Sequence, residues 1–354
     1  MHDDRIDFTR CVMNYMIVVL HAWAAFQYVP NDNMEFVFWT FVCRHLCWLA
    51  MPTFFMISGY LLFQNYTART YPMKMWRRVK KLLIPYIVWN VTFVVIYLSL
   101  SKVVPRLGLR VATFGLDTVK GALFKILNVF ELPIDGPLWF IRTLFLLALI
   151  SPLLYVFMRW SKVLTICLCL IWCVAEVYMG YTDALHLVLP SYGLTCFVIG
   201  GVIALSRRNL ISFFSNKIYL ITGFVFCFLR GIVGIWDLGR EELQFSLQLL
   251  MVLGAIIEAP VLIWLLPKIL DKLYGIGGKC RILKDMSFFA YAGHFLFCSA
   301  WLHGVAPFCG ALRGGKFTIL SCCFIICGMI TIMAVYAVAR KVCPRILRLY
   351  DGTL

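Results

Sequence analysis

Charged side chains are scarce in this 354-residue chain: they make up 14% of it, with 17 acidic residues against 33 lysines and arginines. So little charge excludes a soluble domain of this length. Short segments of alternating polarity, which would indicate a membrane β-barrel, are also absent. The first apolar run is not followed by the small-residue cleavage pattern of a signal peptide. Instead, 62% of the residues are hydrophobic and mean hydropathy is +0.87, in apolar runs of roughly twenty residues. This pattern predicts an all-α polytopic membrane protein.

The apolar runs predict about ten transmembrane helices. Their ranges are 11–29, 36–63, 83–101, 137–157, 163–181, 185–205, 218–236, 244–266, 287–306 and 317–339. With the N-terminus inside the cell, 22 basic residues lie in inner segments and 9 in outer ones. Basic residues favour the cytoplasmic side, so we expect both termini there, in the cytoplasmic (inner) membrane of the cell.

The longest non-spanning stretch is 102–136, on the outer side. Its apolar residues recur at helical spacing from Leu116 to Phe130, which predicts an amphipathic interfacial helix within an extracytoplasmic loop. We expect one membrane-embedded domain over residues 1–354, with no appended soluble domain.

A net charge of +16 and 15 cysteines invite two further interpretations. The basic residues lie mostly in short loops, which the positive-inside rule explains without a nucleic-acid partner. Most cysteines lie inside apolar runs, where they act as small hydrophobes, and none shows metal-ligand spacing. We therefore predict neither nucleic-acid binding nor a metal site.

The first predicted span carries a stripe of polar residues: Asp7, Arg10, Asn14 and His21 share one narrow face of the helix. Arg10 and His21 are separated by about 16 Å along the axis. Polar groups in lipid are costly unless they face protein or water, so the stripe marks a functional path or a buried helix contact. As a general base, neutral His21 would remove a proton from a hydroxyl group.

Arg77, Arg78, Lys80 and Lys81 form a basic cluster at the start of the third span. The cluster either anchors the helix at the cytoplasmic surface or binds phosphates, which arginine contacts through two parallel hydrogen bonds. In the second span, Ser58 and Gly59 allow a ligand or another backbone to approach closely.

Arg142, close to Trp139 at the outer end of the fourth span, either extends to the surface or holds a sugar or an oxyanion. Glu176 and Glu258 either pair with Arg230 or are protonated. For His294 in the ninth span we favour a structural hydrogen bond, with a second functional group as the alternative.

Taken in order, five of these pieces resemble the acyltransferase family 3 of integral membrane O-acyltransferases, which modify bacterial surface polysaccharides. They are Arg10 with His21 eleven positions on; Pro52 to Tyr60; Arg77 to Tyr86; Leu138-Trp139-Phe140; and Ser287 to His294. The resemblance covers essentially the whole chain. It departs where lysines replace part of the arginine cluster and where Ala292-Gly293 precedes His294.

The resemblance implies transfer of an acyl group, most simply acetyl, from cytoplasmic acyl-CoA to a hydroxyl of an extracytoplasmic or lipid-linked glycan. It implies acyl-CoA as co-substrate, no tightly bound cofactor, and polysaccharide-synthesis machinery as a partner. Catalysis would fall to His21 with Arg10, and donor binding to Arg77, Arg78, Lys80, Lys81 and Ser58. Arg142 and Trp139 would face the acceptor or oxyanion, with Asp7, Asn14 and His294 in support.

Two other functions use the same polar path. One is a transporter or exporter of a glycan or small polar substrate without acyl transfer, although paired half-helices of the kind many transporters show are absent from the sequence. The other is a structural partner in a polysaccharide-synthesis complex. Direct transfer and an acyl-enzyme route both remain open, as does a succinyl or longer acyl donor.

Overall fold

The computed structural model describes residues 4–28, 34–103, 120–121, 125–126, 130–179, 188–236, 244–273, 281–306 and 315–353. Throughout these residues the regular secondary structure is helical, which confirms the all-α class. The first half comprises α1 (Asp4–His21), η1 (Ala22–Tyr28), α2 (Met34–Trp39), η2 (Thr40–Leu46), η3 (Cys47–Leu49), α3 (Ala50–Phe63), α4 (Tyr71–Arg78), η4 (Val79–Leu83), α5 (Ile84–Val103), η6 (Gly136–Leu138), α7 (Trp139–Leu149) and α8 (Ser151–Trp160). The second half comprises α9 (Lys162–Tyr178), α11 (Ser191–Leu205), α12 (Leu210–Phe213), α13 (Lys217–Trp236), α14 (Gln244–Leu273), α15 (Arg281–Val305), α16 (Lys316–Val342) and α17 (Pro344–Asp351).

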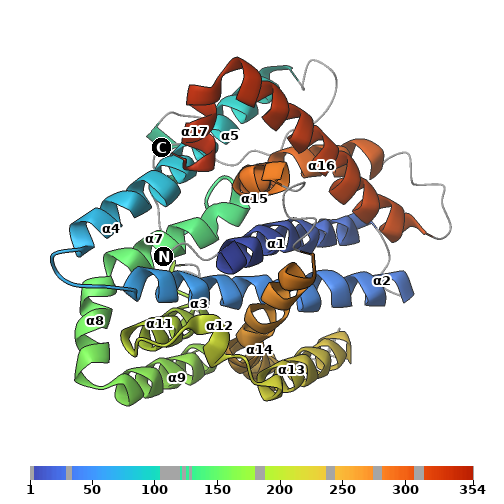
Figure 1. Ribbon diagram of the computed structural model, residues 1–354. Helices are drawn as coiled ribbons and strands as arrows, with labels where there is room; N and C mark the ends of the chain where they lie inside the picture. The colour runs from blue at the N-terminus through green and yellow to red at the C-terminus, as the bar shows by residue number, and fades with distance from the viewer. Residues whose placement is uncertain are drawn as a thin grey trace.

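Helix α3 runs through the centre of the molecule (Figure 1) and is buried on almost every side. Its closest neighbour is α11, and glycines on both helices bring the backbones together. A Cβ atom on Gly59 would lie 1.9 Å from the carbonyl oxygen of Phe197, and one on Gly200 would lie 2.0 Å from that of Met56. Lipid tails provide no hydrophobic driving force between helices. Small residues at such contacts allow the close van der Waals packing that holds the helices together instead.

Helix α1 lies along α3 in Figure 1, and it also packs against α14 and α15. Helices α15, α16, α5 and α17 lie on the side of α1 opposite α3. Of the polar stripe of α1, Asp7, Asn14 and His21 are therefore partly buried against protein, whereas the Arg10 side chain is 47% exposed. Partial burial against protein lowers the cost of polar groups in a membrane.

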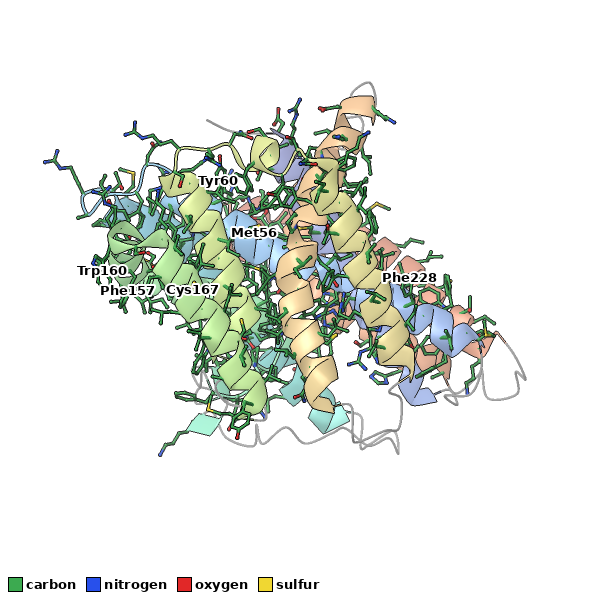
Figure 2. The ribbon with its side chains drawn as sticks, turned by 90° about the horizontal axis from the view of Figure 1, so that it is seen from below. Met56, Tyr60, Phe157, Trp160, Cys167 and Phe228 are labelled. Atoms are coloured by element: carbon green, nitrogen blue, oxygen red, sulfur yellow. The ribbon has the colours of Figure 1, made fainter. Side chains whose placement is uncertain are left out.

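Helices α9, α11, α14 and α13 form a row on the other side of α3, seen from below in Figure 2. Helix α13 of this row and the neighbouring α8 expose large apolar side chains, among them Phe228 of α13 and Phe157 and Trp160 of α8, which are 58%, 38% and 75% exposed. Exposed apolar side chains of this kind fit contact with lipid tails.

Each of the ten predicted ranges is helical over most of its described residues. By length and composition, four described helices can cross a membrane by themselves: Met34–Phe63, Tyr71–Ile96, Gln248–Lys272 and Lys316–Val342. A fifth span results if Gly136–Leu149 and Ser151–Trp160, bent by 57°, count as one. The number ten and the cytoplasmic termini stay predictions. The predicted interfacial helix in 102–136 lies mostly outside the described residues.

Candidate active site

Two histidines from distant parts of the chain face each other in the membrane domain. His21 ends α1 and His294 lies within α15, and their ring centroids are 4.7 Å apart with the planes tilted by 46°. The pair forms because α1 and α15 pack against one another. The sequence indicated each histidine separately but not their contact.

Both rings are held by their Nδ1 atoms to carbonyls of their own helices. His21 Nδ1 lies 2.8 Å from the Ile17 carbonyl oxygen, and His294 Nδ1 lies 2.5 Å from that of Tyr291. A carbonyl only accepts, so each Nδ1 carries the proton and each Nε2 of a neutral ring keeps its lone pair. Nε2 of His294 is buried without a hydrogen-bond partner in the described part of the chain. The structural bond favoured for His294 is thus present at Nδ1, and it leaves a second nitrogen available for chemistry.

A cavity of about 520 Å³ lies beside residues 7–14 of α1, and neither His21 nor His294 lines it. Four basic residues line it: Arg10, Arg78, Lys81 and Lys284. Three acidic residues line it too: Asp7, Asp285 and Asp351. Two of these carboxylates are paired, Asp7 with Arg10 at 3.6 Å and Asp285 with Arg340 at 3.4 Å. The cavity wall is therefore net positive, and its volume is typical of a site for a small ligand.

The polar face of α1 lines the cavity with Asp7, Arg10 and Asn14, and His21 follows Asn14 by about two helical turns. Asn14 Nδ2 donates to Ser287 Oγ at 3.3 Å across the α1–α15 contact. Tyr291 lines the cavity, and its carbonyl is the one that holds His294. Because His294 follows Tyr291 by three residues, the ring lies about one helical turn beyond the cavity wall.

Six predicted site residues thus share one cavity: Asp7, Arg10, Asn14, Ser58, Arg78 and Lys81. Arg78 also donates from Nη2 to the Ser58 carbonyl oxygen at 3.3 Å. Arg77 and Lys80 are not among the lining residues; Arg77 contacts Met73 Sδ, and Lys80 lies over the Trp76 ring. Lys284 joins from α15, and only the folded chain reveals it. In the sequence, the sign of this role was that Lys284 lies three residues before Ser287, a spacing that places both on one face of a helix.

A different set of residues gathers where α7 begins. Arg142 is 6% exposed and donates from Nη1 to the Glu131 carbonyl oxygen at 2.6 Å. Trp139 is the first residue of α7 and packs against Phe140. Neither residue lines the cavity of Arg10 and Lys81. Their proposed contact with the acceptor would therefore be made away from the basic cavity.

Asp135, which the sequence did not single out, precedes η6 and is completely buried. Its backbone N–H donates to Asn90 Oδ1 at 3.1 Å, but neither carboxylate oxygen has a hydrogen-bond partner among the described residues. Burial raises the pKa of this carboxyl group well above its ordinary value. An unpaired buried carboxyl is costly to stability and marks a candidate functional group.

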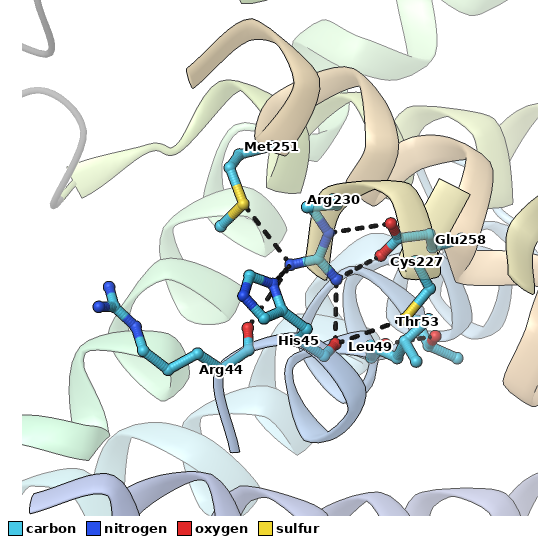
Figure 3. A network of polar contacts seen from close by, with 8 residues as sticks. All are labelled: Arg44, His45, Leu49, Thr53, Cys227, Arg230, Met251 and Glu258. Carbon is cyan, nitrogen blue, oxygen red and sulfur yellow. Dashed lines mark hydrogen bonds and ion pairs between the residues drawn. The ribbon is translucent and has the colours of Figure 1, made fainter. Parts of the chain in front are cut away.

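The two carboxylates considered as partners of Arg230, Glu176 and Glu258, make different contacts. Arg230 of α13 makes two hydrogen bonds to Glu258 of α14, from Nε at 2.9 Å and from Nη2 at 2.7 Å (Figure 3). The same guanidinium donates to the His45 carbonyl oxygen at 3.0 Å, which belongs to the π-helical turn η2. Glu176 instead accepts from the Ser191 N–H at 3.2 Å, at the start of α11. Of the two pairings considered for Arg230, the structure therefore shows the one with Glu258. This ion pair joins α13 to α14.

Comparisons with known proteins identify the family of the chain. Over 153 residues, or 40% of its length, the chain is 28% identical to a curated relative, the succinoglycan biosynthesis protein ExoH of Rhizobium meliloti (strain 1021). The aligned stretch spans 41% of that relative. No solved structure matches the chain. A family model described as an acyltransferase domain matches residues 3–338. Because this match covers nearly the whole chain, the protein belongs to the acyltransferase family 3.

Proposed function

We propose that this protein transfers an acyl group, most simply acetyl, from cytoplasmic acyl-CoA to a hydroxyl group of an extracytoplasmic or lipid-linked glycan. The observation that carries the proposal is a pair of imidazoles on α1 and α15, about one to two helical turns beyond a net positive cavity that the same two helices line. The name of the relative, a succinoglycan biosynthesis protein, favours a polysaccharide acceptor. Membership of an acyltransferase family disfavours the transporter alternative. We place the protein in the cytoplasmic membrane on the charge distribution of its loops.

The donor would bind with its phosphates among Arg10, Arg78, Lys81 and Lys284. Guanidinium groups suit phosphate oxygens because they offer two parallel donors, and ammonium groups add positive charge. The apolar residues of the same cavity, Phe54 and Phe140 among them, suit the pantetheine arm. The arm would carry the thioester past Asn14 toward His21. Arg77 and Lys80, outside the cavity, fit helix anchoring at the membrane surface.

The reaction requires a base near the thioester. His21 Nε2 would take the proton of the acceptor hydroxyl as its oxygen attacks the thioester carbonyl carbon. The tetrahedral intermediate collapses as the C–S bond breaks, and the imidazolium returns the proton to the leaving thiolate. The products are the acyl ester and free coenzyme A. His294 Nε2, which has no hydrogen-bond partner among the described residues, would accept a hydrogen bond from the acceptor and so orient it.

An acyl-enzyme route uses the same groups in a different order. In that route His21 Nε2 attacks the thioester carbonyl carbon, and the acceptor hydroxyl then attacks the acyl-imidazole. Rapid quenching of the enzyme with labelled acetyl-CoA, without acceptor, distinguishes the routes. Label bound to the protein in amounts approaching one per chain indicates the acyl-enzyme, and absence of label indicates direct transfer.

The central test is the His21→Ala variant, assayed in membranes with labelled acetyl-CoA and purified surface glycan. Loss of the base should lower the rate by about 10²-fold to 10⁴-fold. His303→Ala, an exposed histidine on α15, is the matched control and should keep wild-type activity. Undiminished transfer by correctly folded His21→Ala protein would refute the proposal. Mass spectrometry of surface glycans from cells with and without the protein then identifies acyl group and acceptor together.

A further inference from the structure

The residues after α16 fold back to the cavity lined by Arg10 and Lys81, which we call the donor cavity. Helix α17 (Pro344–Asp351) is followed by Gly352 and Thr353, and Asp351, Gly352 and Thr353 all line the cavity that holds Arg10 and Lys81. The family model matches residues 3–338, so this segment lies outside the part of the chain that identifies the family. We call residues 344–353 the return segment.

The return segment is firmly docked on α5. Trp89 Nε1 donates to the Tyr350 carbonyl oxygen at 3.1 Å, and Thr92 Oγ1 lies 2.7 Å from the Tyr350 hydroxyl. The Trp89 ring meets that of Tyr350 edge to face, with centroids 5.0 Å apart. Leu347 is buried at 5% exposure. These apolar and polar contacts hold the segment in one position relative to the cavity.

Gly352 makes the closest approach to the donor site. Its φ of +69° favours glycine, and a Cβ atom there would lie 2.9 Å from the Lys81 carbonyl oxygen and 3.1 Å from its Cα. Both atoms are backbone, so they yield less readily than a side chain. Any side chain at position 352 must therefore displace either the return segment or Lys81.

Beyond Gly352 the chain closes into a small turn. The Thr353 N–H donates to Asp351 Oδ1 at 3.0 Å and the Thr353 hydroxyl donates to the same oxygen at 2.6 Å. The turn holds the Asp351 carboxylate, and Asp351 lines the same cavity as Lys81. A carboxylate there accepts hydrogen bonds from amines or hydroxyls, whereas the neighbouring cations attract phosphates.

We infer that the return segment recognises the nucleotide portion of the acyl-CoA donor. It positions Lys81 for the phosphates through the Gly352 contact and offers Asp351 to the amino or hydroxyl groups of the nucleoside. The inference rests on the proposed function. It assigns the segment to the nucleotide and not to the thioester, because the segment lies with the cations of the cavity, whereas Tyr291 and the histidine pair lie where the thioester would react.

The test uses Gly352→Ala in the full-length protein, with two donors: acetyl-CoA and S-acetyl-pantetheine, which lacks the nucleotide. We expect the KM for acetyl-CoA to rise at least about tenfold, and the KM for S-acetyl-pantetheine to change by less than about twofold. Gly315→Ala is the matched control. Gly315 has the same kind of backbone, with φ +71°, but a Cβ there meets nothing closer than Ile319 Cδ1 at 3.9 Å. The control should leave both constants unchanged.

Thr353→Ala removes a hydrogen bond of the same turn without introducing a clash between positions 352 and 81. It tests whether the return segment recognises the nucleotide if the Gly352→Ala protein is not recovered from membranes. It should raise the KM for acetyl-CoA severalfold and again spare the pantetheine donor. Unchanged KM values in both variants, or equal increases for both donors, would overturn the inference while the proposed function stands. A wild-type protein that transfers no acyl group from acetyl-CoA, succinyl-CoA or a longer acyl-CoA overturns the proposed function first, before any variant is compared.

Discussion

Replacing Glu258 with glutamine should destabilise the protein strongly, because Glu258 is the carboxylate that neutralises Arg230. Both side chains are 0% exposed, and they are joined at 2.7 Å. At a separation of about 4 Å, an effective dielectric constant near 20 makes the attraction about 4 kcal/mol. Removing one partner of a buried pair leaves the other charge uncompensated, at a cost of about 3–5 kcal/mol. At about 2 °C per kcal/mol for a chain of this size, the thermal midpoint should fall by about 6–10 °C.

The assay is thermal unfolding of the detergent-solubilised protein, followed by loss of the monodisperse peak in size-exclusion chromatography. Asp271→Asn is the control, since its pair with Arg5 at 3.2 Å has side chains 48% and 50% exposed. Such surface pairs contribute about 0–1 kcal/mol. Adding Arg230→Met to Glu258→Gln removes the uncompensated charge and should recover part of the loss. A midpoint within about 2 °C of wild type for Glu258→Gln, or strictly additive losses in the double variant, would refute the reasoning.

Three further predictions concern the helix contact, the buried carboxyl and the donor cavity. Gly59→Ala should lower the thermal midpoint by several degrees, since its Cβ would lie 1.9 Å from the Phe197 carbonyl oxygen; an unchanged midpoint would mean that the α3–α11 distance adjusts freely. Burial raises the pKa of Asp135, so the folded state favours its protonated form and loses stability as pH rises above about 4, where an unfolded aspartate ionises. Asp135→Asn should therefore unfold at a higher temperature than wild type at pH 7.5 but not at pH 4, and a difference independent of pH would contradict this. Lys81→Ala should raise the KM for acetyl-CoA about tenfold and Lys80→Ala should leave it within about twofold, because only Lys81 lines the cavity; equal effects would show that the cluster acts only through its overall charge.

Much of the site was predictable because local patterns carry chemical meaning. Helical periodicity alone aligned Arg10, Asn14 and His21 on one face of α1. The cost of polar groups in lipid then required that face to meet protein or water. The family resemblance carried by the Arg10–His21 spacing and the later motifs is confirmed by the match over residues 3–338.

The sequence could not separate the residues of the basic cluster. Arg77, Arg78, Lys80 and Lys81 occupy four of five consecutive positions, and a helix distributes such positions around its axis. The π-helical turn η4 (Val79–Leu83) changes that distribution again. Only the packed structure shows that Arg78 and Lys81 line the cavity.

By itself, the sequence determined that this chain is a helical membrane protein with a polar path beginning at Arg10, because hydropathy and helical periodicity are local properties. Tertiary structure alone decided three things: that His294 faces His21, that Arg230 pairs with Glu258, and that Gly352 contacts Lys81. Each joins residues separated by dozens to hundreds of positions in the chain. Such contacts depend on which helices pack together and on close approaches at small residues, and neither is encoded in the spacing within a single helix.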